Sequence, residues 1–277
     1  MPLQSMVPML DKARSAGYAV GLFDAHSLEL MLGILEAAEE QRSPVIIAPM
    51  FVDRRAAGAL IRELAAQASV PVAIELDHGR DFPSVVDAIR AGFTDVMLDA
   101  STLPYEENVA LTRRAAEAAH AVGLGVEGEI GHVGRGEHYA DVAALEASMT
   151  RPEEAARFVA DTGVDALAVA FGSAHGVYRG KPRLDLARLG QIRSLVHVHL
   201  VLHGGSGIAD DDFRRCIEAG ISKINIYTAM ALAALGAMRE AVAEPAPSYI
   251  QVGRRVQAAI KDVVAHHMQV FGSAGKA

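Results

Sequence analysis

The chain has one cysteine, no tryptophan and few aromatic residues, and these shortages narrow its class. A single thiol, Cys216, cannot close an internal disulfide, which favours a reducing compartment, so we expect a cytoplasmic protein. Cys216 lies in a helical pattern at 211–219, where a buried, inert thiol fits better than a nucleophile. No apolar run approaches the roughly 20 residues of a membrane span, and the N-terminus has no basic and apolar leader.

Positive charge is also scarce, with 26 lysines and arginines against 34 acidic residues. The basic residues are scattered, so the sequence does not indicate a surface for nucleic acid. Apolar residues make up 51% of the 277 positions, which is enough for a full core. The length fits one large α/β domain over 1–277 better than two small ones. We therefore expect one domain whose partners are neither nucleic acid nor membrane.

Short β-branched or apolar runs alternate with segments in which apolar residues recur every three or four positions, as in helices packed on a barrel. Ser27 and Thr150 are expected to cap helices. The eight predicted strands span 19–23, 45–48, 72–76, 95–98, 125–130, 166–169, 199–202 and 223–226. Eight strand–helix units in this length fit a (β/α)8 TIM barrel of roughly 250 residues. The alternative is an open doubly wound sheet, but no Gly-x-Gly-x-x-Gly turn follows the first strand.

Two segments break the alternation. Residues 131–149 form a long connection after the fifth strand, and loops of that length are usually functional lids or disordered. Residues 249–271 add a helical segment after the eighth helix. We therefore expect a barrel with an extra C-terminal helix.

Polar residues stand at the ends of six successive strands, where a barrel carries its chemistry. They are Asp77, His78, Asp99, Glu127, Glu129, His175, His203 and Asn225. Each histidine alone is explained as an ordinary strand-end residue, but His78, His175 and His203 together favour a metal. Imidazoles suit Zn²⁺, and three protein ligands leave the open position that a catalytic metal needs. The remaining histidines, including His26 and His132, are interpreted as surface, strand or loop residues.

The carboxylates at these strand ends suit different tasks. Asp77 adjoins His78 but points in another direction, which suits a general acid/base or, failing that, a partner that orients a histidine. Asp99 and Glu129 fit as partners of the ligands or as alternative metal ligands. Glu127 fits barrel packing and an ion pair equally well.

Glycine-rich turns follow the sixth and seventh predicted strands. Backbone N–H groups can approach an anion closely where the turns contain Gly176, Gly204, Gly205 and Gly207. Ser206 adds a hydroxyl donor. Flexible turns look the same, but barrels commonly bind phosphate after strands seven and eight. The position of this Gly-Gly-Ser-Gly turn before the eighth strand favours a phosphate site.

These motifs resemble, in order and over nearly the whole chain, those of class II (zinc-dependent) ketose-bisphosphate aldolases of the tagatose- and fructose-bisphosphate type. The matching stretches are Leu76-Asp77-His78-Gly79, Met97-Leu98-Asp99-Ala100-Ser101, Glu127-Gly128-Glu129-Ile130-Gly131, Ala170-Phe171-Gly172-Ser173-Ala174-His175-Gly176-Val177-Tyr178, Leu200-Val201-Leu202-His203-Gly204-Gly205-Ser206-Gly207 and Lys223-Ile224-Asn225-Ile226. The resemblance implies an aldolase that cleaves or forms a phosphorylated ketose through a zinc-stabilised enediolate of dihydroxyacetone phosphate.

The resemblance also implies roles for single residues. It implies that Asp77 moves the proton of the hydroxyl at the carbon–carbon bond, and that Glu137 moves the proton on the enediolate carbon. It implies one Zn²⁺ per subunit, held by His78, His175 and His203. Asp99 and Glu129 match carboxylates that support the ligands or form an alternative metal site. The positions that match the binding site of dihydroxyacetone phosphate are Gly176, Gly204, Ser206, Asn225 and Thr228.

In such a family a monovalent cation, Na⁺ or K⁺, often assists these loops. The substrate is a small sugar phosphate, and the family favours a homodimer or homotetramer, with the C-terminal helix as a candidate contact.

Several positions depart from the family pattern, and we expect all of them near the end of the barrel that carries the chemistry. They are Asp24 for Asn, Glu75 for His, Pro49-Met50 for hydroxyl residues and Tyr227 for a smaller residue. The metal and acid/base residues are intact, so retro-aldol chemistry is expected. The added charge at Asp24 and the lost hydroxyls argue against a standard bisphosphate. The alternatives are another ketose phosphate, a metal-dependent sugar-phosphate isomerase or epimerase, and a non-catalytic partner subunit.

Overall fold

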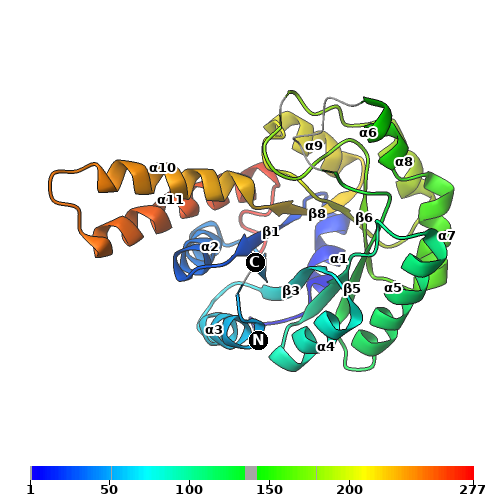
Figure 1. Ribbon diagram of the computed structural model, residues 1–277, viewed down its shortest axis with the longest axis horizontal. Helices are drawn as coiled ribbons and strands as arrows, with labels where there is room; N and C mark the ends of the chain where they lie inside the picture. The colour runs from blue at the N-terminus through cyan, green and yellow to red at the C-terminus, as the bar shows by residue number, and fades with distance from the viewer. Residues whose placement is uncertain (1, 51, 135–141, 179) are drawn as a thin grey trace.

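The computed structural model of the protein describes residues 2–50, 52–134, 142–178 and 180–277 (Figure 1). Eight parallel strands pair in chain order and close into a barrel, with β1 beside β8. The strands are β1 (Val20–Ala25), β2 (Val45–Pro49), β3 (Val72–Gly79), β4 (Asp95–Leu98), β5 (Gly125–Ile130), β6 (Ala166–Val169), β7 (His199–Leu202) and β8 (Ile221–Ile226). The predicted (β/α)8 barrel is confirmed.

Helices surround the barrel because the strands are apolar on both faces and need cover outside as well as inside. These helices are α2 (Leu28–Gln41), α3 (Arg54–Ala66), α4 (Phe82–Ala91), α5 (Tyr105–His120), α6 (Val142–Ser148), α7 (Pro152–Thr162), α8 (Leu186–Leu195), α9 (Asp210–Glu218) and α10 (Thr228–Val242). The sequence predicts one long connection over 131–149, but part of that connection is helix α6. Cys216 is buried in α9, and burial raises the pKa of its thiol to about 12, as fits an inert residue.

A further helix, α1 (Met6–Ala16), precedes the first strand and was not predicted. It packs against β1, β7 and β8. Its buried side chains are Met6, Met9, Leu10 and Ala13, which join the apolar residues inside the barrel in one cluster. Asp95 fixes the start of α1 by accepting hydrogen bonds from the Met6 amide (2.8 Å) and the Ser5 hydroxyl (2.6 Å). Helix α1 therefore covers the end of the barrel at which the strands begin.

The predicted C-terminal helix is confirmed as α11 (Tyr249–Val270). It packs along α10 and against α2, and the orange hairpin of α10 and α11 extends away from the barrel (Figure 1). Several large apolar side chains of this hairpin are exposed, namely Leu232, Leu235, Met238, Val242, Tyr249 and Ile250. In the described part of the chain, no helix combines the length and apolar content needed to cross a membrane.

Candidate metal centre

A cavity of about 500 Å³ opens at the carboxyl ends of the strands, an end of the barrel that we call the mouth. It is lined by many of the residues singled out in the sequence, namely Asp77, His78, Asp99, His175, Gly176, Gly204, Ser206, Asn225 and Thr228. His203 and Glu129 are buried behind this lining. Glu137 lies outside the described residues, so its role stays a prediction.

An irregularity at the end of β3 explains how two consecutive residues face this cavity. In a regular strand, Asp77 and His78 would point to opposite faces. The pairing of β3 with β4 shifts register between Leu76 and Gly79, and His78 takes a left-handed backbone conformation with φ of 44°. Bulges of this kind re-aim side chains beside active sites, and the strain of a non-glycine residue at positive φ is concentrated at functional sites. The bulge brings the carboxylate and the imidazole to one cavity.

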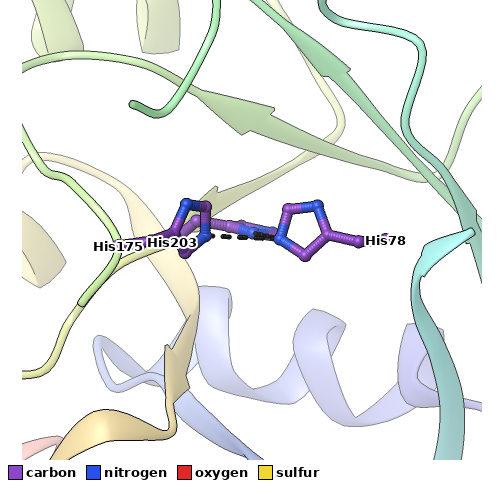
Figure 2. A group of neighbouring side chains, drawn as sticks. All are labelled: His78, His175 and His203. Atoms are coloured by element: carbon purple, nitrogen blue, oxygen red, sulfur yellow. Dashed lines mark hydrogen bonds between the residues drawn. The ribbon is translucent and has the colours of Figure 1, made fainter. Parts of the chain in front are cut away.

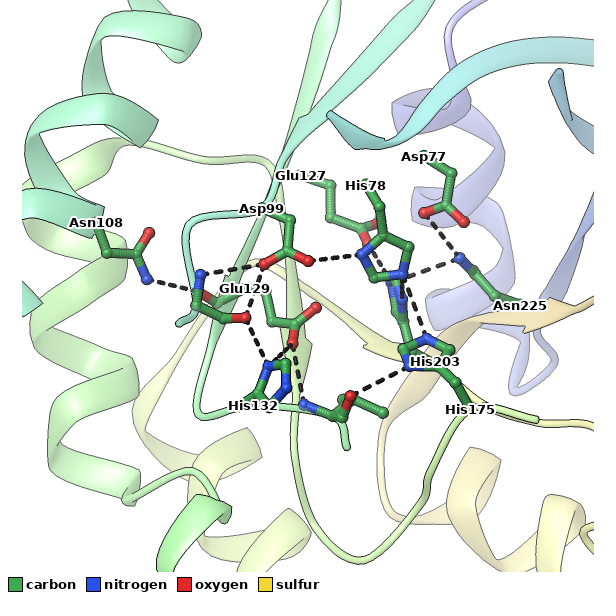
Figure 3. Close-up of polar contacts among 12 residues, drawn as sticks. Asp77, His78, Asp99, Asn108, Glu127, Glu129, His132, His175, His203 and Asn225 are labelled. Carbon is green, nitrogen blue, oxygen red and sulfur yellow. Dashed lines mark hydrogen bonds and ion pairs between the residues drawn. The ribbon is translucent and has the colours of Figure 1, made fainter. Parts of the chain in front are cut away.

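The side chains of the three predicted ligands converge (Figure 2). One ring nitrogen of each contacts an oxygen atom of another residue (Figure 3). His78 donates from Nδ1 to Asp99 (2.7 Å), and His203 donates from Nε2 to Glu127 (2.7 Å). His175 Nδ1 faces the carbonyl of Val133 at 3.2 Å. The second nitrogens meet, because His78 Nε2 lies 3.3 Å from His175 Nε2 and 3.0 Å from His203 Nδ1. Metal-bound histidines are usually held in this way, with one nitrogen on a partner and the other on the ion.

The charges around the three rings also fit a cation. Burial and the two neighbouring imidazoles lower the pKa of His175 to about 3, which leaves a neutral nitrogen free to bind. Burial disfavours the charged form of His78, yet Asp77 and Asp99 raise the pKa of His78 to about 10. The carboxylates of Asp77 and Asp99 therefore favour a positive charge at the point where the imidazole nitrogens meet. The donors of this site fit a divalent metal that accepts nitrogen ligands.

A second group of potential ligands consists of His78, Asp99 and Glu129, whose candidate atoms lie within 4.8 Å of one another. Asp99 orients His78 and in turn accepts hydrogen bonds from the amide and the hydroxyl of Ser101. Burial and the charge of Asp99 raise the pKa of Glu129 to about 7. Both tasks expected of these carboxylates, supporting a ligand and forming an alternative metal site, fit this geometry.

Beneath the histidines lies a fully buried cluster of Glu75, Glu127 and Lys223. The Lys223 ammonium lies 2.7 Å from each carboxylate, and Glu127 also holds His203. Burial alone would lower the pKa of Lys223, but Glu127 and Glu75 raise it above its usual value. Of the two tasks that the sequence left open for Glu127, barrel packing or an ion pair, the structure shows the ion pair. The expectation that Glu75 lies near the mouth is wrong, because it faces the interior of the barrel.

The other departures do line the cavity, namely Asp24, Met50 and Tyr227. Asp24 is buried beside Asp77, and burial together with the Asp77 charge raises the pKa of Asp24 well above its usual value. Asp77 accepts a hydrogen bond from the Asn225 amide at 3.3 Å. The Tyr227 hydroxyl lies 3.1 Å from His26 Nε2, so His26, a loop residue directly after β1, supports this side of the cavity.

The two glycine-rich turns are joined by one side chain. The Tyr178 hydroxyl accepts from the Ala174 amide (2.7 Å) and donates to the Gly204 carbonyl (2.9 Å). Gly204 has φ of 67°, and a Cβ there would lie 2.3 Å from the Ala174 carbonyl oxygen. Ser206 accepts the Ala229 amide of the first turn of α10. These turns and the start of α10 form one wall of the cavity, with the backbone proximity that an anion site requires.

Two side chains make contacts that the sequence did not predict. His132 lies in the loop after β5, which is one of the alternatives left open by the sequence, and there it lines the cavity and lies 3.1 Å from the Ser101 hydroxyl. Its position two residues after the end of β5 could have indicated a place in the cavity, because the cavity opens where the strands end. The contribution of Lys223 to holding Glu127 was missed, because the residues that surround it come from strands far apart in the sequence.

The barrel and its polar mouth define a TIM-barrel enzyme with a candidate metal centre. The family described as class II fructose-bisphosphate aldolase matches residues 4–276, and the chain belongs to this family. The protein is therefore a class II ketose-bisphosphate aldolase, a carbon–carbon lyase. The resemblance seen in the motifs is confirmed, and the family implies a divalent metal and a sugar-phosphate substrate.

Relatives with different substrates resemble the chain to similar degrees. It is 41% identical to a fructose-bisphosphate aldolase of Thermus caldophilus, covering 97% of this chain and 98% of that protein. It is 40% identical to the D-tagatose-1,6-bisphosphate aldolase subunit GatY of Klebsiella oxytoca, over 97% of each chain. The crystal structure of the YdjI aldolase of Escherichia coli K12 superposes with a TM-score of 0.89 and 34% identity, over 99% of each chain.

Proposed function

We propose that the protein cleaves a phosphorylated ketose of the tagatose- or fructose-bisphosphate type to dihydroxyacetone phosphate and an aldehyde, and catalyses the reverse addition. The observation that carries the proposal is the convergence of three imidazole nitrogens, each with its other ring nitrogen on a partner. In the proposal one Zn²⁺ binds His78, His175 and His203. When bound, the cation supplies Lewis acidity that stabilises negative charge on an oxygen next to the reacting carbon.

The chain's own residues move protons and hold the substrate. Asp77 takes the proton from the hydroxyl on the aldehyde side as the bond breaks and returns it when the bond forms. The Asn225 amide supports this task by donating to the Asp77 carboxylate. We propose that Glu137 exchanges the proton on the enediolate carbon. Dihydroxyacetone phosphate, including its phosphate, is assigned to Gly176, Gly204, Ser206, Asn225 and Thr228, all of which line the cavity.

The test is cleavage of a panel of ketose mono- and bisphosphates by the purified protein, with products identified by mass spectrometry. Chelation with EDTA should abolish cleavage, and added zinc should restore it. Cleavage that is indifferent to chelation would overturn the metal assignment. Conversion of the ketose into an isomer or epimer without carbon–carbon cleavage would favour that alternative, and turnover by the protein alone would exclude a non-catalytic subunit.

We further propose that the protein acts as one domain in the cytoplasm, and that a monovalent cation, Na⁺ or K⁺, assists the glycine-rich turns. Replacing K⁺ and Na⁺ by tetramethylammonium should then slow turnover. We also propose a homodimer or homotetramer formed through the α10–α11 hairpin, because its exposed apolar side chains need cover. Light scattering should give two or four subunits, and Leu235→Glu should shift the mass toward a single chain.

A further inference from the structure

Two of the three proposed metal ligands lie in turns rather than in strands. His78 belongs to β3, but His175 lies in the turn after β6, and His203 follows the last residue of β7. Connecting segments are more mobile than the strands that they join. Ligands are ready for an ion only where the surrounding contacts hold them within a small tolerance. The positions of His175 and His203 therefore depend on contacts made by these two turns.

One hydroxyl group contacts both turns, each time at the residue next to a ligand. The Tyr178 hydroxyl accepts from the Ala174 amide at 2.7 Å and donates to the Gly204 carbonyl at 2.9 Å. Ala174 directly precedes His175, and Gly204 directly follows His203. A phenol has one proton to donate and lone pairs that accept, so both bonds form at the same time. The hydroxyl thus connects the backbone of one ligand to the backbone of the other.

The packing around this hydroxyl leaves little room for another arrangement. A Cβ at Gly204 would lie 2.3 Å from the Ala174 carbonyl oxygen and 3.0 Å from the His175 amide nitrogen. A Cβ at Gly207 would lie 3.2 Å from the Tyr178 ring. Ala174 is almost fully buried, so water does not readily replace the hydroxyl as the partner of its amide. The two turns therefore stay together only while Tyr178 keeps its bonds.

The imidazole rings themselves do not set every separation within the centre (Figure 2). His78 lies between the other two, with ring centroids 5.0 Å from His175 and 4.7 Å from His203. The centroids of His175 and His203 are farther apart, at 5.8 Å. Among the described residues, those that line the cavity do not include Tyr178. Its hydroxyl therefore acts on the centre through the residues beside the ligands.

We propose that the Tyr178 hydroxyl is a positioning group of the metal centre, which sets the separation of His175 and His203 and with it the affinity and coordination geometry of the zinc site. The inference rests on the proposed aldolase function. The same two bonds hold the turns that contain Gly176 and Gly204, which are assigned to dihydroxyacetone phosphate. The hydroxyl thus also fixes the place of the substrate relative to the ion.

Tyr178→Phe tests the inference, because it keeps the ring and deletes only the hydroxyl. Competition with a chromophoric chelator should show a zinc affinity about 10- to 100-fold lower than that of the wild type, as for other groups that hold a metal-binding histidine in place. The visible absorption spectrum of the Co²⁺-loaded variant should differ from that of the wild type, since it reports the coordination geometry. At saturating zinc, the KM for dihydroxyacetone phosphate in hydrogen exchange with D₂O should rise.

Tyr105→Phe is the matched control. The Tyr105 hydroxyl donates to Asp161 at 3.0 Å between the outer helices α5 and α7, and Tyr105 is half-buried like Tyr178. This variant should leave the zinc affinity, the cobalt spectrum and the KM unchanged. Thermal unfolding of the metal-free proteins is measured first, and all comparisons are made at a temperature at which all three are folded. If Tyr178→Phe lowers the Tm but matches Tyr105→Phe in zinc affinity and cobalt spectrum, the hydroxyl only stabilises the fold and the inference is overturned.

The wild type separates this inference from the proposed function. A wild type that binds zinc and exchanges the hydrogen of dihydroxyacetone phosphate, together with a Tyr178→Phe variant that does the same equally well, would refute the positioning role alone. A wild type that neither binds zinc nor catalyses exchange would refute the proposed function itself.

Discussion

The buried cluster under the histidines offers a sharp test, through Lys223→Met. Lys223 holds Glu75 and Glu127 at 2.7 Å each, and all three side chains are fully buried. The substitution leaves two carboxylates facing each other without a cation. Removing one partner of a buried ion pair costs about 3–5 kcal/mol, which is a large part of a typical unfolding free energy of roughly 5–15 kcal/mol.

The same substitution should weaken metal binding. Glu127 accepts the Nε2 proton of His203, and without Lys223 that carboxylate is no longer fixed. Loss of support for a metal-binding histidine typically reduces metal affinity about 10- to 100-fold. Denaturant unfolding of the metal-free protein measures the first effect, and competition with a chromophoric zinc chelator measures the second.

Two further variants make the result interpretable. Lys261→Met removes a lysine that pairs with Glu40 at a similar distance of 2.9 Å on the surface, where solvent screens the pair, and it should change little. Glu75→Gln combined with Lys223→Met restores the net charge of the cluster and should recover part of the lost stability. If Lys223→Met destabilises the protein no more than Lys261→Met does, the interpretation of the cluster as a stabilising buried ion pair is wrong.

Three other tests address separate parts of the structure. Asp77→Ala should lower turnover by about 10²- to 10⁴-fold with metal content unchanged, whereas parallel loss of metal and turnover would assign Asp77 a structural task. Burial raises the pKa of Asp95 to about 6, so the folded state binds this proton more tightly and the protein loses stability as pH rises from about 4 to 6. Asp95→Asn should remove this pH dependence, which amounts to about 3 kcal/mol of unfolding free energy between these pH values. Denaturant unfolding measured across this range is the test, and an unchanged pH dependence would contradict the assignment. Gly204→Ala and Gly163→Ala both place alanine at positive φ, but only Gly204 lies against backbone, so its variant should lose more thermal stability; equal shifts in Tm would show that the turn adapts.

The barrel was predictable because its signals are local and repeated. Each strand is a short apolar run, and the polar residues at the strand ends recur around the ring. Ser27 caps α2 as predicted, by accepting the Leu30 amide. Thr150 does not cap α7. Its hydroxyl instead donates to the Ile130 carbonyl and accepts the Ala170 amide, so it joins the ends of β5 and β6.

What the sequence did not reveal depends on contacts between distant segments. The direction of His78 follows from a bulge against β4, and no local pattern announces it. Glu75 looks like a residue of the mouth because it lies two positions before Asp77, yet its partner Lys223 comes from β8. Helix α1 did carry a signal, with Ser5 before apolar residues at helical spacing, but its place under the barrel depends on strands formed by the rest of the chain.

That place has a consequence for the order in which the protein is made. Helix α1 leaves the ribosome before any strand, yet it packs against β7 and β8 as well as β1. The apolar face of this helix therefore stays exposed while most of the chain is synthesised. The closing of the ring and the docking of α1 become one late event, and a nascent chain that stalls before β7 exposes the apolar face of this helix, to which chaperones can bind.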